Sequence, residues 1–111
     1  MNPSDRKAAI AAYKERKPAR GVYAVVCTAT GAAWVGHSRH VDTRQNGLWF
    51  ALRQGSGRCP SLQAAWTQHG EGEFRFEELD RLGEDFPAYG LLDELKKRQA
   101  IWQARLQATA L

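Results

Sequence analysis

Two short β-type segments joined by a tight turn constrain the fold of this chain most strongly. Residues 21–28 begin with Gly21-Val22-Tyr23 and are rich in β-branched side chains, and residues 32–37 contain Trp34-Val35-Gly36. Both compositions are typical of β-strands. Gly31 lies between the segments and supplies the permissive backbone that a hairpin loop needs. The pattern predicts a β-hairpin.

The remainder of the chain predicts helices and one further strand. Leu48, Trp49 and Leu52 fall on one face of a helix expected over residues 42–54, with Asp42 as its N-cap and Gly55 after its end. We also expect helices over residues 4–16, 61–68 (capped by Ser61) and 88–107, and a third strand over residues 73–79. These elements predict an α+β fold, a three-stranded antiparallel sheet flanked by helices.

The length and composition set the class of protein. A chain of 111 residues suits one domain, here residues 1–111. No apolar run approaches the length of a transmembrane helix, and the polar N-terminal residues do not resemble a secretory signal. Cys27 and Cys59 have no metal-type spacing and are expected to be free thiols. We therefore expect a cytoplasmic protein without a membrane partner.

The positive charge is concentrated in one half of the chain. The net charge is +4, but residues 1–60 carry ten Lys and Arg against three Asp and Glu, a net +7. Residues 61–111 carry six against nine, a net −3. A basic half fits a surface that binds nucleic-acid phosphates. The alternative for most cations of the N-terminal segment is that they only solubilise an exposed helix.

The order of the two tripeptides and a following arginine resembles the GIY-YIG nuclease superfamily. Gly21-Val22-Tyr23 corresponds to Gly-Ile-Tyr, Trp34-Val35-Gly36 to Tyr-Ile-Gly, and Arg44 to the arginine of the helix that follows. The resemblance covers about residues 20–82, including a run that ends in His69-Gly70. It departs from the family pattern at Trp34, where the family usually has tyrosine.

The resemblance implies an endonuclease that hydrolyses DNA phosphodiester bonds with one Mg²⁺ or Mn²⁺ ion. Tyr23 would order or deprotonate the attacking water, and Arg44 would bind the phosphate. A glutamate of the last helix would hold the metal. Counting from the third strand places this ligand at Glu94, next to Asp93, whereas anchoring on Trp102 places Gln99 there. A neutral amide is a poor magnesium ligand, so the sequence favours Glu94.

Three further residues of the motif region are candidates for the substrate site. Gly36 belongs to the second motif and is expected beside the substrate. Indole N–H is a donor only, so Trp34 can pack in the core or stack on a base, but it cannot accept a proton. His37 can donate a hydrogen bond to a phosphate or carry a proton near neutral pH. Its alternative is a solvated residue at a strand end.

Two hypotheses about function follow. The first is a divalent-metal-dependent DNA endonuclease that uses Tyr23, His37, Arg44 and Glu94. The second is a degenerate domain of the same fold that binds nucleic acid or protein without cutting. A carboxylate facing Tyr23 and Arg44 would favour the first hypothesis, because metal-assisted hydrolysis needs such a ligand.

Overall fold

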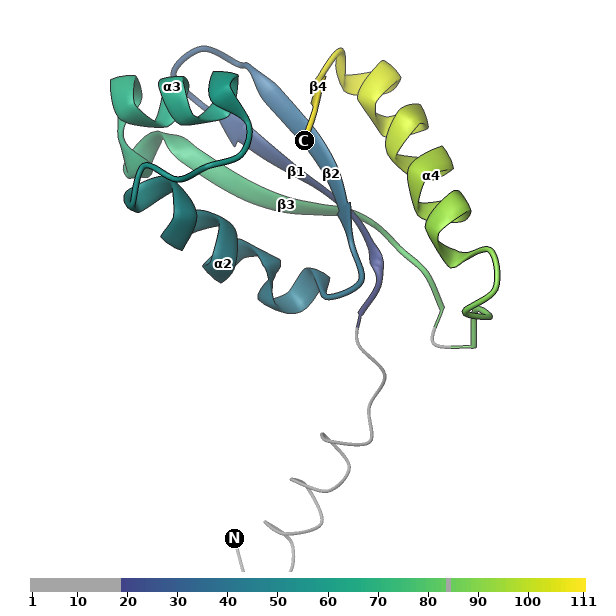
Figure 1. The fold of residues 1–111 in the computed structure, drawn as a ribbon. Coiled ribbons are helices and arrows are strands. Elements are labelled where there is room, and N and C mark those ends of the chain that lie inside the picture. Colours follow the sequence, from purple (N-terminus) through teal and green to yellow (C-terminus); the bar gives the residue numbers. More distant parts are fainter. Residues whose placement is uncertain (1–18, 84) are drawn as a thin grey trace, which may run out of the picture.

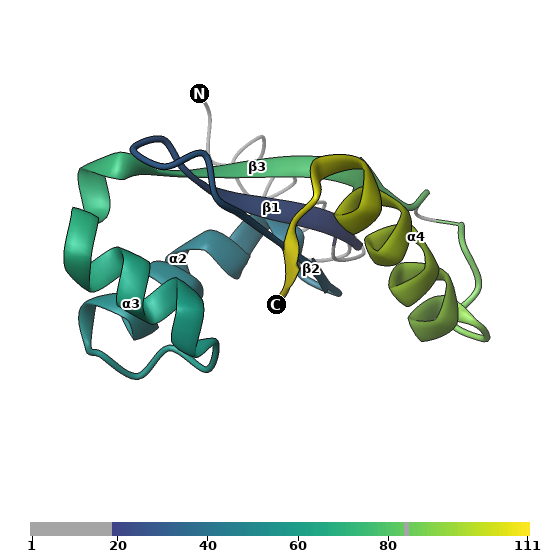
Figure 2. The same ribbon diagram turned by 90° about the horizontal axis from the view of Figure 1, so that it is seen from above.

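The computed structural model describes residues 19–83 and 85–111. A twisted sheet forms the middle of the molecule, with α2 and α3 against one side and α4 against the other (Figures 1 and 2). The strands lie in the order β3-β1-β2-β4. The strands are β1 (Gly21–Cys27), β2 (Ala33–Ser38), β3 (Phe74–Arg81) and β4 (Thr109–Ala110). The helices are α2 (Val41–Arg53), α3 (Pro60–His69), η1 (Glu71–Glu73, a 3₁₀ turn) and α4 (Leu91–Leu106).

The predicted hairpin is confirmed and lies at the centre of the sheet. β1 and β2 pair antiparallel, with Tyr23 opposite Gly36. Gly31 has φ +78° and donates its N–H to the Cys27 carbonyl at 2.8 Å, which closes the turn. β1 also pairs antiparallel with β3, with an irregularity between Val22 and Tyr23. The hairpin therefore carries both motifs on adjacent strands.

The sheet has four strands, where the sequence predicted three. After α4, Gln107 adopts the left-handed conformation (φ 50°) and turns the chain back toward β2. β4 then pairs parallel with Trp34 and Val35. The sequence did not indicate this strand because two residues are too few for a period-2 pattern. Beyond Val35, the outer edge of β2 has no strand partner among the described residues.

Side chains of β1 point alternately into two separate cores. Tyr23 and Val25 face α2 and α3, whereas Val22 and Ala24 face Trp102 of α4. This alternation is the period-2 geometry of a strand that is buried on both faces. The core on the α2 and α3 side contains Trp34, Leu48, Trp49, Leu52, Leu62, Trp66 and Phe74. The sheet therefore separates α4 from the surface that carries Tyr23.

The predicted helices form, but their first turns differ from the expectation. Asp42 does not cap α2: the N-cap is His40, and Asp42 lies inside the first turn, where it pairs with Arg81 instead. Ser61 does not cap α3 either, because Cys59 is the N-cap and Pro60 begins the helix. Proline is favoured there because an N–H group at the start of a helix has no helical acceptor, so its absence costs no hydrogen bond. The helix expected over residues 4–16 lies outside the described residues.

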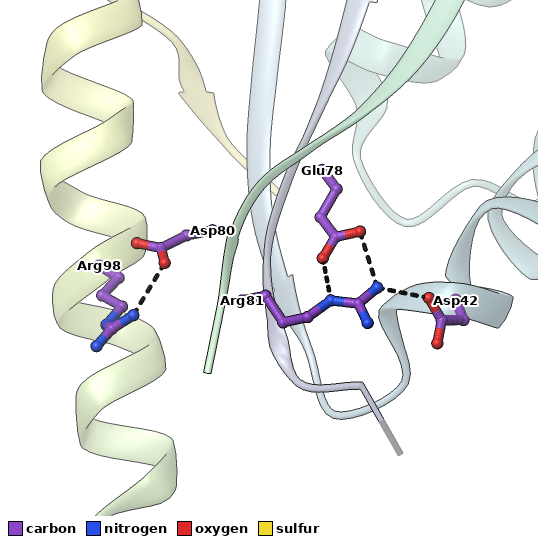
Figure 3. Close-up of polar contacts among 5 residues, drawn as sticks. All are labelled: Asp42, Glu78, Asp80, Arg81 and Arg98. Atoms are coloured by element: carbon purple, nitrogen blue, oxygen red, sulfur yellow. Dashed lines mark hydrogen bonds and ion pairs between the residues drawn. The ribbon is translucent and has the colours of Figure 1, made fainter. Parts of the chain in front are cut away.

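Ion pairs connect β3 to a helix on each side of the sheet (Figure 3). Arg81 pairs with Glu78 on its own strand and with Asp42 of α2 at 2.8 Å. Asp80, the preceding residue, pairs with Arg98 of α4 at 2.9 Å. These side chains are partly exposed, so each pair contributes at most about 1 kcal/mol to stability. Among the described residues, no helix has the length and apolarity needed to cross a membrane.

Gly21 lies where β1 and β3 approach most closely, and this contact predicts a large effect of substitution. A Cβ atom at residue 21 would lie 2.0 Å from the Asp80 carbonyl oxygen, which is backbone and cannot swing aside. We expect Gly21→Ala to lower the free energy of unfolding by about 2 kcal/mol or more, as overpacking does. Urea denaturation followed by circular dichroism measures the change.

The matched control is Gly47→Ala in α2. No atom lies within 4 Å of a Cβ atom at residue 47. Alanine is the better helix former by about 0.8–1 kcal/mol, so this variant is expected to be more stable than the parent. Equal stability of the two variants would contradict the close β1–β3 contact.

Candidate active site

Tyr23 and Arg44 meet on the α2 side of the sheet, as their positions in the motif predicted. The Arg44 Nε–H donates to the Tyr23 hydroxyl at 3.1 Å, and the guanidinium carbon lies 5.9 Å from the centre of the tyrosine ring. Tyr23 is only 2% exposed and stacks on Phe76, with ring centres 4.9 Å apart. The bond to Tyr23 uses one N–H of the guanidinium, so its remaining donors are available for an anion.

Gly36 provides the space that the Tyr23 hydroxyl occupies. A Cβ atom at residue 36 would lie 2.7 Å from the Tyr23 hydroxyl oxygen and 2.8 Å from Cζ. The same atom would lie 3.1 Å from the Leu111 Cβ. The second motif therefore needs glycine because the hydroxyl and Leu111 both pack against this strand position. In this chain the packing thus links the two motifs across the paired strands.

A cavity of about 690 Å³ opens beside this pair of side chains. Its wall combines the motif residues with the loop between α2 and α3 and with the C-terminal residues. The lining residues are Tyr23, Gly36, His37, Arg44, Leu48, Ala51, Leu52, Ser56, Gly57, Arg58, Cys59, Pro60, Leu62, Ala110 and Leu111. Four of the predicted site residues, Tyr23, Gly36, His37 and Arg44, thus share one cavity. Arg58 and Leu111 were not predicted, because neither belongs to a motif or a periodic pattern.

His37 also lines this cavity, and its ring is bonded to a residue of α4. Its Nδ1 atom is hydrogen-bonded to the Gln99 side-chain oxygen, and the Gln99 amide nitrogen donates to the Val35 carbonyl at 3.1 Å. His37 is half-buried at a position where no described strand pairs with β2 on its outer side. From the sequence, Gln99 is expected only as the residue that replaces a metal ligand. Its contact with His37 is not predicted there.

Trp34 lies in the core rather than in the cavity wall. It is 4% exposed, its Nε1–H donates to the Ser61 hydroxyl at 2.9 Å, and its ring packs near Phe74. The bond from Trp34 to Ser61 ties β2 to the first turn of α3. Trp34 does not line the cavity. Of its two expected roles, the one that the structure shows is packing in the core.

Glu94 lies on the other side of the sheet from Tyr23. Its carboxylate pairs with Arg98 at 2.8 Å, and Arg98 also pairs with Asp80 (Figure 3 shows the Asp80 pair). Hydrogen bonding to Glu94, together with the charge of Asp80, raises the pKa of Arg98. Glu94 lines a second cavity of about 340 Å³ with Asp80 and Arg98, and it does not line the first. The structure therefore does not bring Glu94 to Tyr23 and Arg44.

The residues around the first cavity do not fit a magnesium or manganese ion. These hard cations prefer carboxylate and carbonyl oxygens, but no Asp or Glu is among the described residues that line this cavity, and Arg44 and Arg58 are cations. Within residues 19–83 and 85–111, no three His, Cys, Asp or Glu side chains gather at a place that could hold a metal. The cavity is instead suited to an anion, because its ionised side chains are positive.

The fold of this chain is similar to that of the catalytic domain of a homing endonuclease. The catalytic domain of the homing endonuclease I-TevI matches with a TM-score of 0.70 and 18% identity, over 83% of this chain and 97% of that chain. A mutant of the I-TevI catalytic domain matches with a TM-score of 0.68 and 20% identity, over 80% and 84% of the two chains. The GIY-YIG-like fold predicted from the sequence is confirmed.

Comparison with protein-family models finds no match, and comparison with curated proteins finds none either. At identities of 18% and 20%, the two structural matches establish the fold alone. The roles of individual side chains must therefore be argued from this chain's own geometry. The Tyr23–Arg44 contact and the Gly36 packing are the parts of that geometry which agree with the motif.

The contact between Gly36 and Tyr23 predicts how the site responds to a single added methyl group. Gly36→Ala should displace the Tyr23 ring and lower the free energy of unfolding by about 1–3 kcal/mol. It should also separate the hydroxyl from Arg44. Chemical denaturation measures the first effect, and the Arg44 Nε–H signal in an NMR spectrum reports the second.

Gly72→Ala is the control, since a Cβ atom at residue 72 has no neighbour within 4 Å. This variant should retain both the parent stability and the Arg44 signal. An Arg44 signal that is unchanged in Gly36→Ala would contradict the packing described for this site.

Proposed function

We propose that the cavity beside Tyr23 binds the phosphodiester backbone of DNA. The observation that carries this proposal is the Tyr23–Arg44 contact in the cavity wall. The bond through Nε orients the guanidinium and leaves its outer N–H groups for a phosphate, which arginine recognises with two parallel hydrogen bonds. Arg58, exposed on the opposite loop, supplies a second cation to the same cavity.

Charge and fold support the same proposal. The half of the chain that contains Tyr23, Arg44 and Arg58 carries the net +7. A local excess of positive charge attracts a polyanion and makes its binding dependent on salt. The fold is similar to the catalytic domain of a homing endonuclease, which makes DNA the first substrate to test.

A second candidate function is cleavage of the bound DNA. It is favoured by the similarity to the catalytic domain of I-TevI and by the proximity of the Tyr23 hydroxyl to Arg44. Tyr23 and Arg44 would then orient water and the phosphate, respectively. In a metal-dependent reaction the ion would polarise the phosphate oxygens, but the described residues of the cavity wall include no Asp or Glu side chain to hold it. For this reason we rank binding above cleavage.

The binding proposal predicts that Arg44 contributes more than other arginines. Arg44→Ala should weaken DNA binding about tenfold, as loss of one charge-assisted hydrogen bond does. It should also reduce the slope of log affinity against log salt by about 1. Fluorescence anisotropy with a labelled duplex and a labelled single strand measures both quantities.

Arg105→Ala is the matched control because Arg105 lies on α4, where it covers the Trp102 ring. This variant should change DNA affinity little. Arg44→Lys keeps the charge but loses the planar fork of donors, so it should restore binding only in part. Equal effects at positions 44 and 105, or affinity insensitive to salt, would favour a protein-interaction domain instead.

The cleavage candidate is tested separately with Mg²⁺ or Mn²⁺ and both forms of DNA. Cleavage that requires the metal and is lost in Tyr23→Phe and in Glu94→Ala would establish the endonuclease and the carboxylate expected from the sequence. With Glu94 bound to Arg98 on the other side of the sheet, we expect Glu94→Ala to leave DNA binding unchanged. Binding without cleavage by the parent would favour the degenerate domain.

A further inference from the structure

The hydrogen bonds around Gln99 determine which nitrogen of His37 carries a proton. The Val35 carbonyl can only accept, so the Gln99 group that contacts it at 3.1 Å must be the NH₂. The other end of this amide, its oxygen, is therefore the atom that faces His37 Nδ1. Because an amide oxygen can only accept, Nδ1 must be the donor.

We infer that Gln99 is a positioning residue that holds neutral His37 with its proton on Nδ1 and leaves Nε2 as an unprotonated acceptor. In this tautomer Nε2 can take up a proton, and only then can it donate to a phosphate oxygen. The inference deepens the proposed function, on which its consequence for DNA rests. The tautomer itself depends only on the chain from Val35 through Gln99 to His37.

The surroundings of His37 determine how its protonation couples to an anion. From α4 it meets the neutral Gln99 amide. The titratable or charged residues that share its cavity are Tyr23 from β1, Arg44 from α2, and Arg58 and Cys59 from the loop before α3. No Asp or Glu side chain is among the described residues that line this cavity, so a bound phosphate would be the negative partner of the imidazolium. Phosphate binding should then favour protonated His37, and DNA should bind more tightly to the protein in which this ring is protonated than to the protein in which it is neutral.

Gln99→Glu is the informative variant because it has nearly the same shape and places a carboxylate on Nδ1. A carboxylate stabilises the imidazolium, so the His37 ring should stay protonated to a higher pH than in the parent. The pH at which DNA binding weakens should shift upward with it. Gln99→Ala removes the acceptor, so the neutral ring should lose its preference for a proton on Nδ1.

The experiment is a ¹⁵N NMR titration of the His37 ring in the full chain, repeated with DNA anisotropy across pH 5–9. We expect the Nδ1–H tautomer in the parent, its loss in Gln99→Ala, and a ring that stays protonated to higher pH in Gln99→Glu. Gln103→Ala, an amide on the same helix that is not hydrogen-bonded to His37, should match the parent. A parent ring with its proton on Nε2, or a tautomer unchanged in Gln99→Ala, overturns the inference.

The NMR result is independent of DNA, so it separates this inference from the proposed function. If the titration behaves as expected and no DNA binds at any pH, the proposed function is wrong and the positioning role of Gln99 stands. If DNA binds but its pH dependence is the same in the parent and in Gln99→Glu, the coupling of His37 to the phosphate is wrong.

Discussion

The packing of the Tyr23 hydroxyl against Gly36 is the contact on which the site depends. It requires that β1 and β2 pair with these two residues opposite each other, and that residue 36 has no side chain. Once the hydroxyl occupies this space, it offers an acceptor to Arg44, the fourth residue of α2. The register of one strand pair therefore determines the position of a guanidinium that is twenty-one residues further along the chain.

The alternation of side chains along β1 and β2 explains why His37 behaves differently from its neighbour Gly36. Adjacent residues of a strand point to opposite faces, so Gly36 meets Tyr23 while the His37 ring meets Gln99 of α4. His37 still lines the cavity, because the short β4 covers β2 only as far as Val35. The end of the sheet thus allows a residue held by α4 to contribute to a site on the α2 side.

The sequence predicted the parts of the structure that depend on local pattern. The hairpin, the helix that carries Arg44 and the C-terminal helix all follow from turn residues and periodic apolar positions, and they form near the expected bounds. Asp42 and Ser61 do not cap α2 and α3, because both side chains contact residues that are distant in the sequence. Arg81 pairs with Asp42, and Trp34 donates to Ser61. The bond between Gln99 and His37 joins residues 62 positions apart, so no local pattern indicates it.

The distribution of carboxylates on either side of the sheet gives the first cavity its electrostatic character. Asp80 and Glu94 both pair with Arg98 on the α4 side, and Glu78 and Asp42 pair with Arg81 at the edge. These acids therefore pair with arginines outside the cavity, whereas Arg44 and Arg58 line it and no Asp or Glu side chain is among its described lining residues. A low-dielectric wall strengthens the field of such cations. The same arrangement that favours a phosphate in this cavity makes it unsuitable for a divalent cation, which is why its affinity for DNA and its ability to cut DNA must be measured separately.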